Sequence, residues 1–212
     1  MTRTFSRVVA SVRQRIVGAV RGMAAPEEQV RRDLTGGVAQ RLGDSYHRAW
    51  NDALRLAASV GEADGLEPML DADETAERAR HTAQEWTSEV TDIVRGQAQS
   101  SRVSGRLLAG GINVVTLSLM VSVFAMTGGV TGVEVGVAGA SAALSQTILE
   151  SYFGERTVRA LATQAREALE RLAADSLAEV VAPVATRLDN SREHERIAAL
   201  ESALATAREA LV

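Results

Sequence analysis

The chain contains no cysteine and no lysine, and the two absences exclude several kinds of site. Without cysteine it forms no disulfide, no thiolate metal site and no cysteine nucleophile. All 23 basic residues are arginine. A Walker A loop, whose lysine reaches the nucleotide phosphates, therefore cannot form, and neither can a lysine Schiff base. The sequence predicts no enzymatic site and no bound cofactor.

Aromatic residues make up only 3% of the sequence, and three prolines occur. Sheets rely on aromatic and β-branched side chains, whereas alanine, arginine, glutamate and leucine, which dominate here, are good helix formers. The composition therefore predicts an all-α protein. We expect an elongated antiparallel helical bundle with a projecting apolar helical hairpin.

Acidic residues are missing from residues 1–25, which hold five arginines, although the whole chain has a net charge of −4. Apolar residues at helical spacing from Phe5 to Val20 make this segment a basic amphipathic helix. Such a helix binds an anionic membrane surface or packs its apolar stripe on the bundle, and both interpretations remain open. The acidic remainder of the chain lacks the extended basic face that nucleic-acid binding requires.

Residues 26–106 are predicted to form the first part of a helical stalk bundle. Pro26 suits a first helical turn, and a turn-rich stretch from Gly61 to Asp73 separates two amphipathic helices, the second capped by Asp71 or Asp73. Their expected core seams are Val30, Leu34, Val38, Leu42, Tyr46, Trp50, Leu54 and Ala57, then Ala76, Ala79, Ala83, Trp86, Val90 and Ile93.

Residues 155–212 are predicted to complete the bundle. Apolar residues again recur at steps of three and four after Gly154, and Pro183 is expected to kink or divide the helix. Ile197, Leu200, Leu204, Ala207 and Leu211 continue the pattern as a coiled-coil-like strand. We expect self-association, or pairing with a partner, through the Leu34/Trp50 or the Ile197/Leu204 seam.

Residues 107–149 carry one ionisable side chain, Glu134, and each half is long enough to cross about 30 Å of hydrocarbon as a helix. We interpret this segment as an apolar membrane hairpin, or paddle, with Glu134 near its tip. The apolar residues expected to meet the lipid bilayer are Leu107, Leu108, Leu117, Leu119, Val121, Phe124, Val130, Val133, Val137, Leu144 and Leu149.

Small residues in this segment suggest how the two halves pack. Gly128 and Gly129 supply the turn, and Gly132, Gly136 and Ala140 recur every four residues as a smooth stripe. Ser118 and Ser122 are expected to form hydrogen bonds across the pair. The flanking basic residues, Arg102, Arg106, Arg156 and Arg159, predict that both ends stay on the cytoplasmic face of the plasma membrane.

Two alternatives to a membrane stalk remain open. A helix that is apolar on all sides is buried either in lipid or in protein. If the hairpin is buried in protein, the chain is a soluble helical interaction or scaffold protein whose hairpin lies in its core or against a partner. A pore-forming or holin-like function is the other alternative, although most of the chain is stalk.

The remaining polar residues do not form a recognisable site. His47, His81 and His194 stand singly, without a second histidine at a metal-ligand spacing. Asp71, Asp73 and Glu74 lack the glycine and terminal glutamate of a calcium loop, and suit the start of a helix instead. We therefore predict no catalytic residue and no metal ligand.

Several segments are similar to the C-terminal helical half of actinobacterial dynamin-like GTPases. They are Val30-Arg31-Arg32-Asp33-Leu34-Thr35, Arg48-Ala49-Trp50, Asp92-Ile93-Val94-Arg95-Gly96, the stretch VSVFAMTGGVTGVEVGVAGASAALSQTILESYFG from Val121 to Gly154, and Glu155 to Leu161. In that family a GTPase domain precedes a helical stalk whose apolar tip touches or enters the membrane. The resemblance implies a membrane-remodelling role for residues 107–149. It also implies that hydrolysis belongs to a separate or missing GTPase domain.

Overall fold

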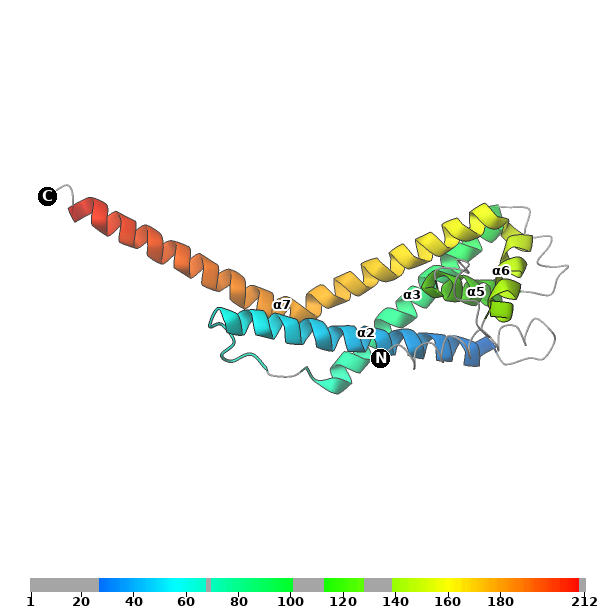
Figure 1. Cartoon of the computed structure of the whole chain (residues 1–212), viewed down its shortest axis with the longest axis horizontal. Coiled ribbons are helices and arrows are strands. Elements are labelled where there is room, and N and C mark those ends of the chain that lie inside the picture. Colours follow the sequence, from blue (N-terminus) through cyan, green and yellow to red (C-terminus); the bar gives the residue numbers. More distant parts are fainter. Residues whose placement is uncertain (1–26, 68–69, 101–112, 128–138, 210–212) are drawn as a thin grey trace.

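The computed structural model describes residues 27–67, 70–100, 113–127 and 139–209. Every regular element in these ranges is an α-helix, which confirms the all-α class. The helices are α2 (Glu27–Ser59), α3 (Ala72–Ser100), α5 (Val114–Thr127), α6 (Gly139–Phe153) and α7 (Glu155–Glu209), and they pack into a bundle (Figure 1). The predicted basic helix in residues 1–25 lies outside the described residues.

Helices α2 and α3 form the most extensive helix pair, and the expected seam of α2 lies between them and α7. The Tyr46 hydroxyl donates to Thr82 Oγ1 at 3.3 Å, and the Thr35 and Thr87 hydroxyl oxygens lie 3.4 Å apart. Because the pairing order reverses along the two helices, α2 and α3 run in opposite directions. All the predicted α2 seam residues are buried except Leu54, which is half-buried.

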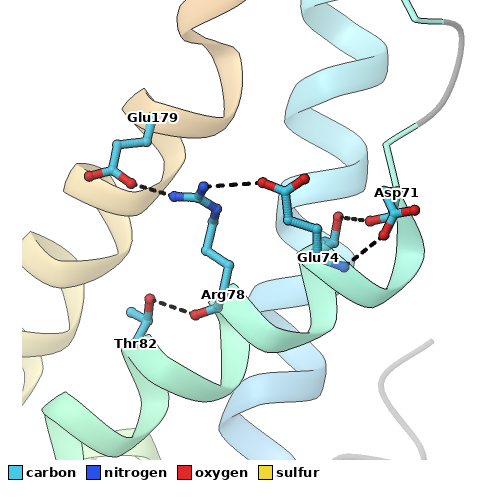
Figure 2. Close-up of polar contacts among 6 residues, drawn as sticks. Asp71, Glu74, Arg78, Thr82 and Glu179 are labelled. Atoms are coloured by element: carbon cyan, nitrogen blue, oxygen red, sulfur yellow. Dashed lines mark hydrogen bonds and ion pairs between the residues drawn. The ribbon is translucent and has the colours of Figure 1, made fainter.

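The turn between α2 and α3 and the start of α3 agree with the sequence prediction. Gly61 and Gly65 adopt positive φ angles of 78° and 76°, which other residues rarely tolerate. The Asp71 carboxylate accepts a hydrogen bond from the Glu74 backbone N–H at 2.8 Å (Figure 2). Asp71, and not Asp73, is therefore the N-cap of α3.

The core of the bundle is centred on α3. Trp86 is fully buried, and its indole N–H donates to the Ala165 carbonyl of α7 at 2.7 Å. The prediction was wrong for two residues of the α3 seam. Ala76 is exposed and Ile93 is only half-buried, while Val94, which was not predicted, is fully buried. The α3 seam thus deviates from the predicted register at both of its ends.

Helix α7 continues through Pro183, so the proline kinks the helix but does not divide it. Proline has no N–H to donate to the carbonyl four residues earlier, that of Glu179, and such a gap bends a helix. Figure 1 shows α7 changing direction near its middle, with its C-terminal part (orange to red) extending away from the other helices. After Val184, the described side chains up to Ser191 are exposed or half-buried.

Candidate functional site

The candidate site is the apolar helix α5, the described part of the first half of the predicted hairpin. It packs against α3 and α7 and also contacts α2 and α6. Leu117 and Val121 are completely buried, and Leu119 retains only 3% exposure. Phe124 is half-buried. Neighbouring helices of the same chain therefore cover Leu117, Leu119 and Val121, three of the side chains predicted to meet lipid.

Both ends of α5 are held by side chains within the bundle. At its start, the Asn113 side-chain oxygen accepts a hydrogen bond from the Thr116 N–H at 2.9 Å, as an N-cap does. At its end, the Arg166 guanidinium of α7 donates to the Ala125 carbonyl from Nη2 at 2.9 Å and from Nε at 3.3 Å. A carbonyl in the last turn of a helix lacks a helical partner and carries partial negative charge, so a cation stabilises it.

Among the described residues, the two serines of α5 form hydrogen bonds within their own helix. Ser118 donates to the Val114 carbonyl at 2.7 Å, and Ser122 donates to the Ser118 carbonyl at 2.9 Å. Within the described residues, both hydroxyls therefore donate inside α5, and hydrogen bonds from these serines to residues 128–138 stay a prediction. Both hydroxyls are buried, and bonding four residues back is how a buried hydroxyl in a helix is satisfied without a neighbouring polar group.

Helix α6 begins at Gly139 and contacts α5 and α7. Leu149 is fully buried, and Ala140 and Leu144 lie in this helix. The other predicted lipid-facing and turn residues lie outside the described residues. They are Leu107, Leu108, Val130, Val133, Val137, Gly128, Gly129, Gly132 and Gly136.

The flanking arginines are described only on the C-terminal side. Arg156 and Arg159 are exposed in the first turns of α7, and Arg159 pairs with Glu155 one turn earlier. Arg102 and Arg106 lie outside the described residues. The placement of all four beside a membrane stays a prediction.

A hairpin that projects from the bundle is not confirmed, because α5 lies among the other helices. None of the described helices is both long and apolar enough to cross a membrane. Helix α5 itself has 14 residues, which corresponds to about 21 Å along its axis and is shorter than the roughly 30 Å hydrocarbon layer. Within the described part of the chain, α5 has the geometry of a core helix.

The expected association seam on α2 is also enclosed. Leu34 and Trp50 retain 2% and 5% exposure, so a partner reaches neither side chain while the bundle is folded. The side chains of the second expected seam, Ile197 and Leu204, lie outside the described set, although both residues belong to α7. Of the two predicted seams, only the one on α7 is left as a candidate for association.

The polar contacts that hold the core helices together have no signature in the sequence. Arg166 follows the buried Ala165 in α7, and nothing in its sequence context distinguishes it from the other arginines of that helix. Trp86 was predicted to be buried, but its hydrogen bond to Ala165 depends on how α3 and α7 cross. Neither contact can be predicted without knowing which helices are neighbours.

Comparison of the chain with protein-family models, with curated proteins and with solved structures gave no match.

Replacing Arg166 with methionine is expected to lower the free energy of unfolding by about 1–3 kcal/mol, because the α5 terminus loses its charged donor while most of the aliphatic packing is kept. Chemical denaturation followed by circular dichroism measures the change. Arg156→Met is the matched control, since Arg156 is exposed and forms no ion pair or hydrogen bond with the described residues. Equal stability of the two variants would show that the Arg166 contact contributes nothing.

Proposed function

We propose that this chain is a helical stalk: an antiparallel bundle that uses the apolar helix α5 as its structural core and presents α7 to a partner. Its function is then mechanical and needs no reaction chemistry of its own. The observation that carries the proposal is the enclosure of α5, whose Leu117 and Val121 are completely buried by other helices of the same chain.

The arm of α7 beyond Pro183 is the proposed contact region. This part extends away from the other helices (Figure 1), and its sequence repeats apolar residues at steps of three and four from Ile197 to Leu211. Such a pattern is typical of a helix that pairs with another helix. The partner is a second copy of the chain or, as the family resemblance implies, a dynamin-like GTPase.

A membrane-remodelling role is the second candidate function. Because α5 is enclosed in the bundle, only the rest of the apolar segment is left to contact the membrane. Glu134 is the only ionisable residue between Arg106 and Glu150, so the apolar sequence continues beyond the part that the bundle covers. Membrane contact would then be made by the stretch between α5 and α6, residues 128–138, as a shallow insertion at the cytoplasmic face of the plasma membrane. The dynamin-like role rests on the resemblance of Val121 to Gly154.

Sedimentation of native membranes before and after an alkaline carbonate wash tests the stalk proposal. We expect the intact chain in the wash supernatant, because α5 stays in the protein core. Retention of the folded chain in the washed membranes would contradict a core role for α5.

Flotation with anionic vesicles tests shallow insertion separately. If residues 128–138 touch lipid, Val133→Asp is expected to reduce flotation severalfold, because a carboxylate is costly in the bilayer. Val60→Asp is the matched control, since Val60 is 58% exposed and lies in the turn after α2. Equal flotation of the two variants would exclude lipid contact at Val133.

A further inference from the structure

The arm of α7 is joined to the rest of its helix at a weak point. Pro183 lies inside the helix and gives the Glu179 carbonyl no N–H donor. Helices bend most sharply where a proline interrupts the hydrogen bonds that run along them. The direction of the arm therefore depends on the contacts that α7 makes just beyond Pro183.

One such contact joins the arm to the turn between α2 and α3. The Arg187 guanidinium donates to the Asp64 carbonyl, and its Nε lies 3.4 Å from the Glu62 carboxylate. Gly65 lies against the same group, since a Cβ atom at this position would be 3.9 Å from Arg187 Nη2. Figure 1 shows the end of α2 (cyan) beside the bend of α7. The turn of residues 61–67 thus contacts α7 one helical turn beyond the proline.

The turn suits a cation. It contains Glu62, Asp64 and Glu67 and no basic residue. The Arg187 side chain is 44% exposed and the Glu62 side chain 33%, so the ion pair is partly shielded from water. A guanidinium that bonds a carboxylate and a backbone carbonyl together forms a stronger contact than a surface ion pair alone.

We propose that Arg187 is a latch: bonded to the α2–α3 turn it fixes the direction of the α7 arm, and when it is released the arm swings about Pro183. Val184, the next residue after the proline, is 1% exposed, so the arm stays attached to the bundle beside the hinge. Arg187 lies about 6 Å beyond Pro183 along the helix, whereas Glu209 lies about 39 Å beyond it. A movement of about 1 Å at the latch therefore becomes about 6 Å at Glu209.

The latch regulates the region that we propose for partner contact. A molecule that takes the place of Arg187 on the acidic turn changes the direction of the arm without touching the arm. A partner that binds the arm in another direction has to break the same contact, so the turn and the arm are coupled. As a regulation of the arm, the inference rests on the proposed function. Its test needs no partner and no membrane, so its failure is distinct from a failure of the carbonate-wash experiment.

Double electron–electron resonance between two spin labels measures the direction of the arm in the full chain. The chain has no native cysteine, so Ala58→Cys and Ser202→Cys supply the label sites. Ala58 is exposed near the end of α2, and Ser202 lies in the arm about 28 Å beyond Pro183. A swing of about 20° carries Ser202 roughly 10 Å. We expect a narrow distance distribution in the parent, and at least about twofold broadening of it by Arg187→Gln.

Arg171→Gln is the matched control. Arg171 also lies on α7 and bonds to a second helix, with its Nη2 2.6 Å and 2.8 Å from the two Glu89 carboxylate oxygens of α3. The substitution removes the same charge and an inter-helix ion pair, but on the other side of Pro183. It is expected to leave the distance distribution unchanged.

Pro183→Ala tests the hinge itself. Alanine restores the N–H donor to the Glu179 carbonyl, and an unbroken helix resists bending. The double variant Pro183→Ala/Arg187→Gln is therefore expected to keep a distribution as narrow as that of Pro183→Ala alone.

Two results would overturn the proposal, provided that circular dichroism shows the variants to be folded. The first is a distribution for Arg187→Gln no broader than that for Arg171→Gln, which would show that Arg187 does not hold the arm. The second is equal broadening by Arg187→Gln with and without Pro183→Ala, which would show that the arm does not swing about the proline.

Discussion

Replacing Val121 with aspartate is expected to abolish the cooperative thermal unfolding of the protein. Val121 is completely buried in α5, and its neighbours on α5 are apolar or are serines already bonded within the helix. An unpaired carboxylate there loses its hydration without gaining a partner, which costs at least about 4 kcal/mol. Domains are commonly stable by only about 5–15 kcal/mol, so most of the stability would be lost.

The same substitution at an exposed valine gives the control. Val60 is 58% exposed after the end of α2, so Val60→Asp should change the melting temperature by only a degree or two. Circular dichroism at 222 nm and differential scanning calorimetry record both variants. A cooperative melt of Val121→Asp close to that of the parent protein would show that the bundle does not need α5 in its core.

Truncating Trp86 to alanine is expected to lower the free energy of unfolding by about 3–5 kcal/mol. The side chain is fully buried between α3 and α7, so its removal leaves a large cavity. It also removes the donor to the Ala165 carbonyl, the only side-chain hydrogen bond from α3 to a backbone group of α7 among the described contacts. The melting temperature should fall by about 10 °C or more.

Phenylalanine substitutions separate packing from hydrogen bonding at the two tryptophans. Trp86→Phe keeps most of the ring but loses the bond to Ala165, whereas the buried Trp50 indole N–H has no hydrogen-bond partner in the described part of the chain. Trp86→Phe should therefore be more destabilising than Trp50→Phe by about 1 kcal/mol. Urea denaturation curves of the two variants measure the difference, and a larger loss for Trp50→Phe would contradict this account of the α3–α7 contact.

The sequence was sufficient to predict the helices and most of their buried faces. The seam from Val30 to Trp50, the turn containing Gly61 and Gly65, and the Asp71 cap all depend on local spacing and local hydrogen bonds. Local chemistry determines such features, so they can be inferred without knowing which helices are neighbours.

The environment of the apolar segment could not be inferred in the same way. A helix that is apolar on all sides has the same sequence signature whether lipid or protein surrounds it. The covering surfaces come from α3 and α7, which lie on both sides of α5 in the chain, and the Arg166 contact to Ala125 joins residues 41 positions apart. Only tertiary structure brings these residues together.

A lipid-quenching measurement tests the central claim, that α5 belongs to the protein core, most directly. Phe124 is half-buried in α5, and Phe124→Trp places a fluorescent reporter there. In vesicles of brominated lipid we expect the variant to be quenched no more than the parent chain, whose Trp50 and Trp86 supply the baseline. Strong additional quenching of the Phe124→Trp protein would place α5 in lipid and contradict its role as the core of the bundle.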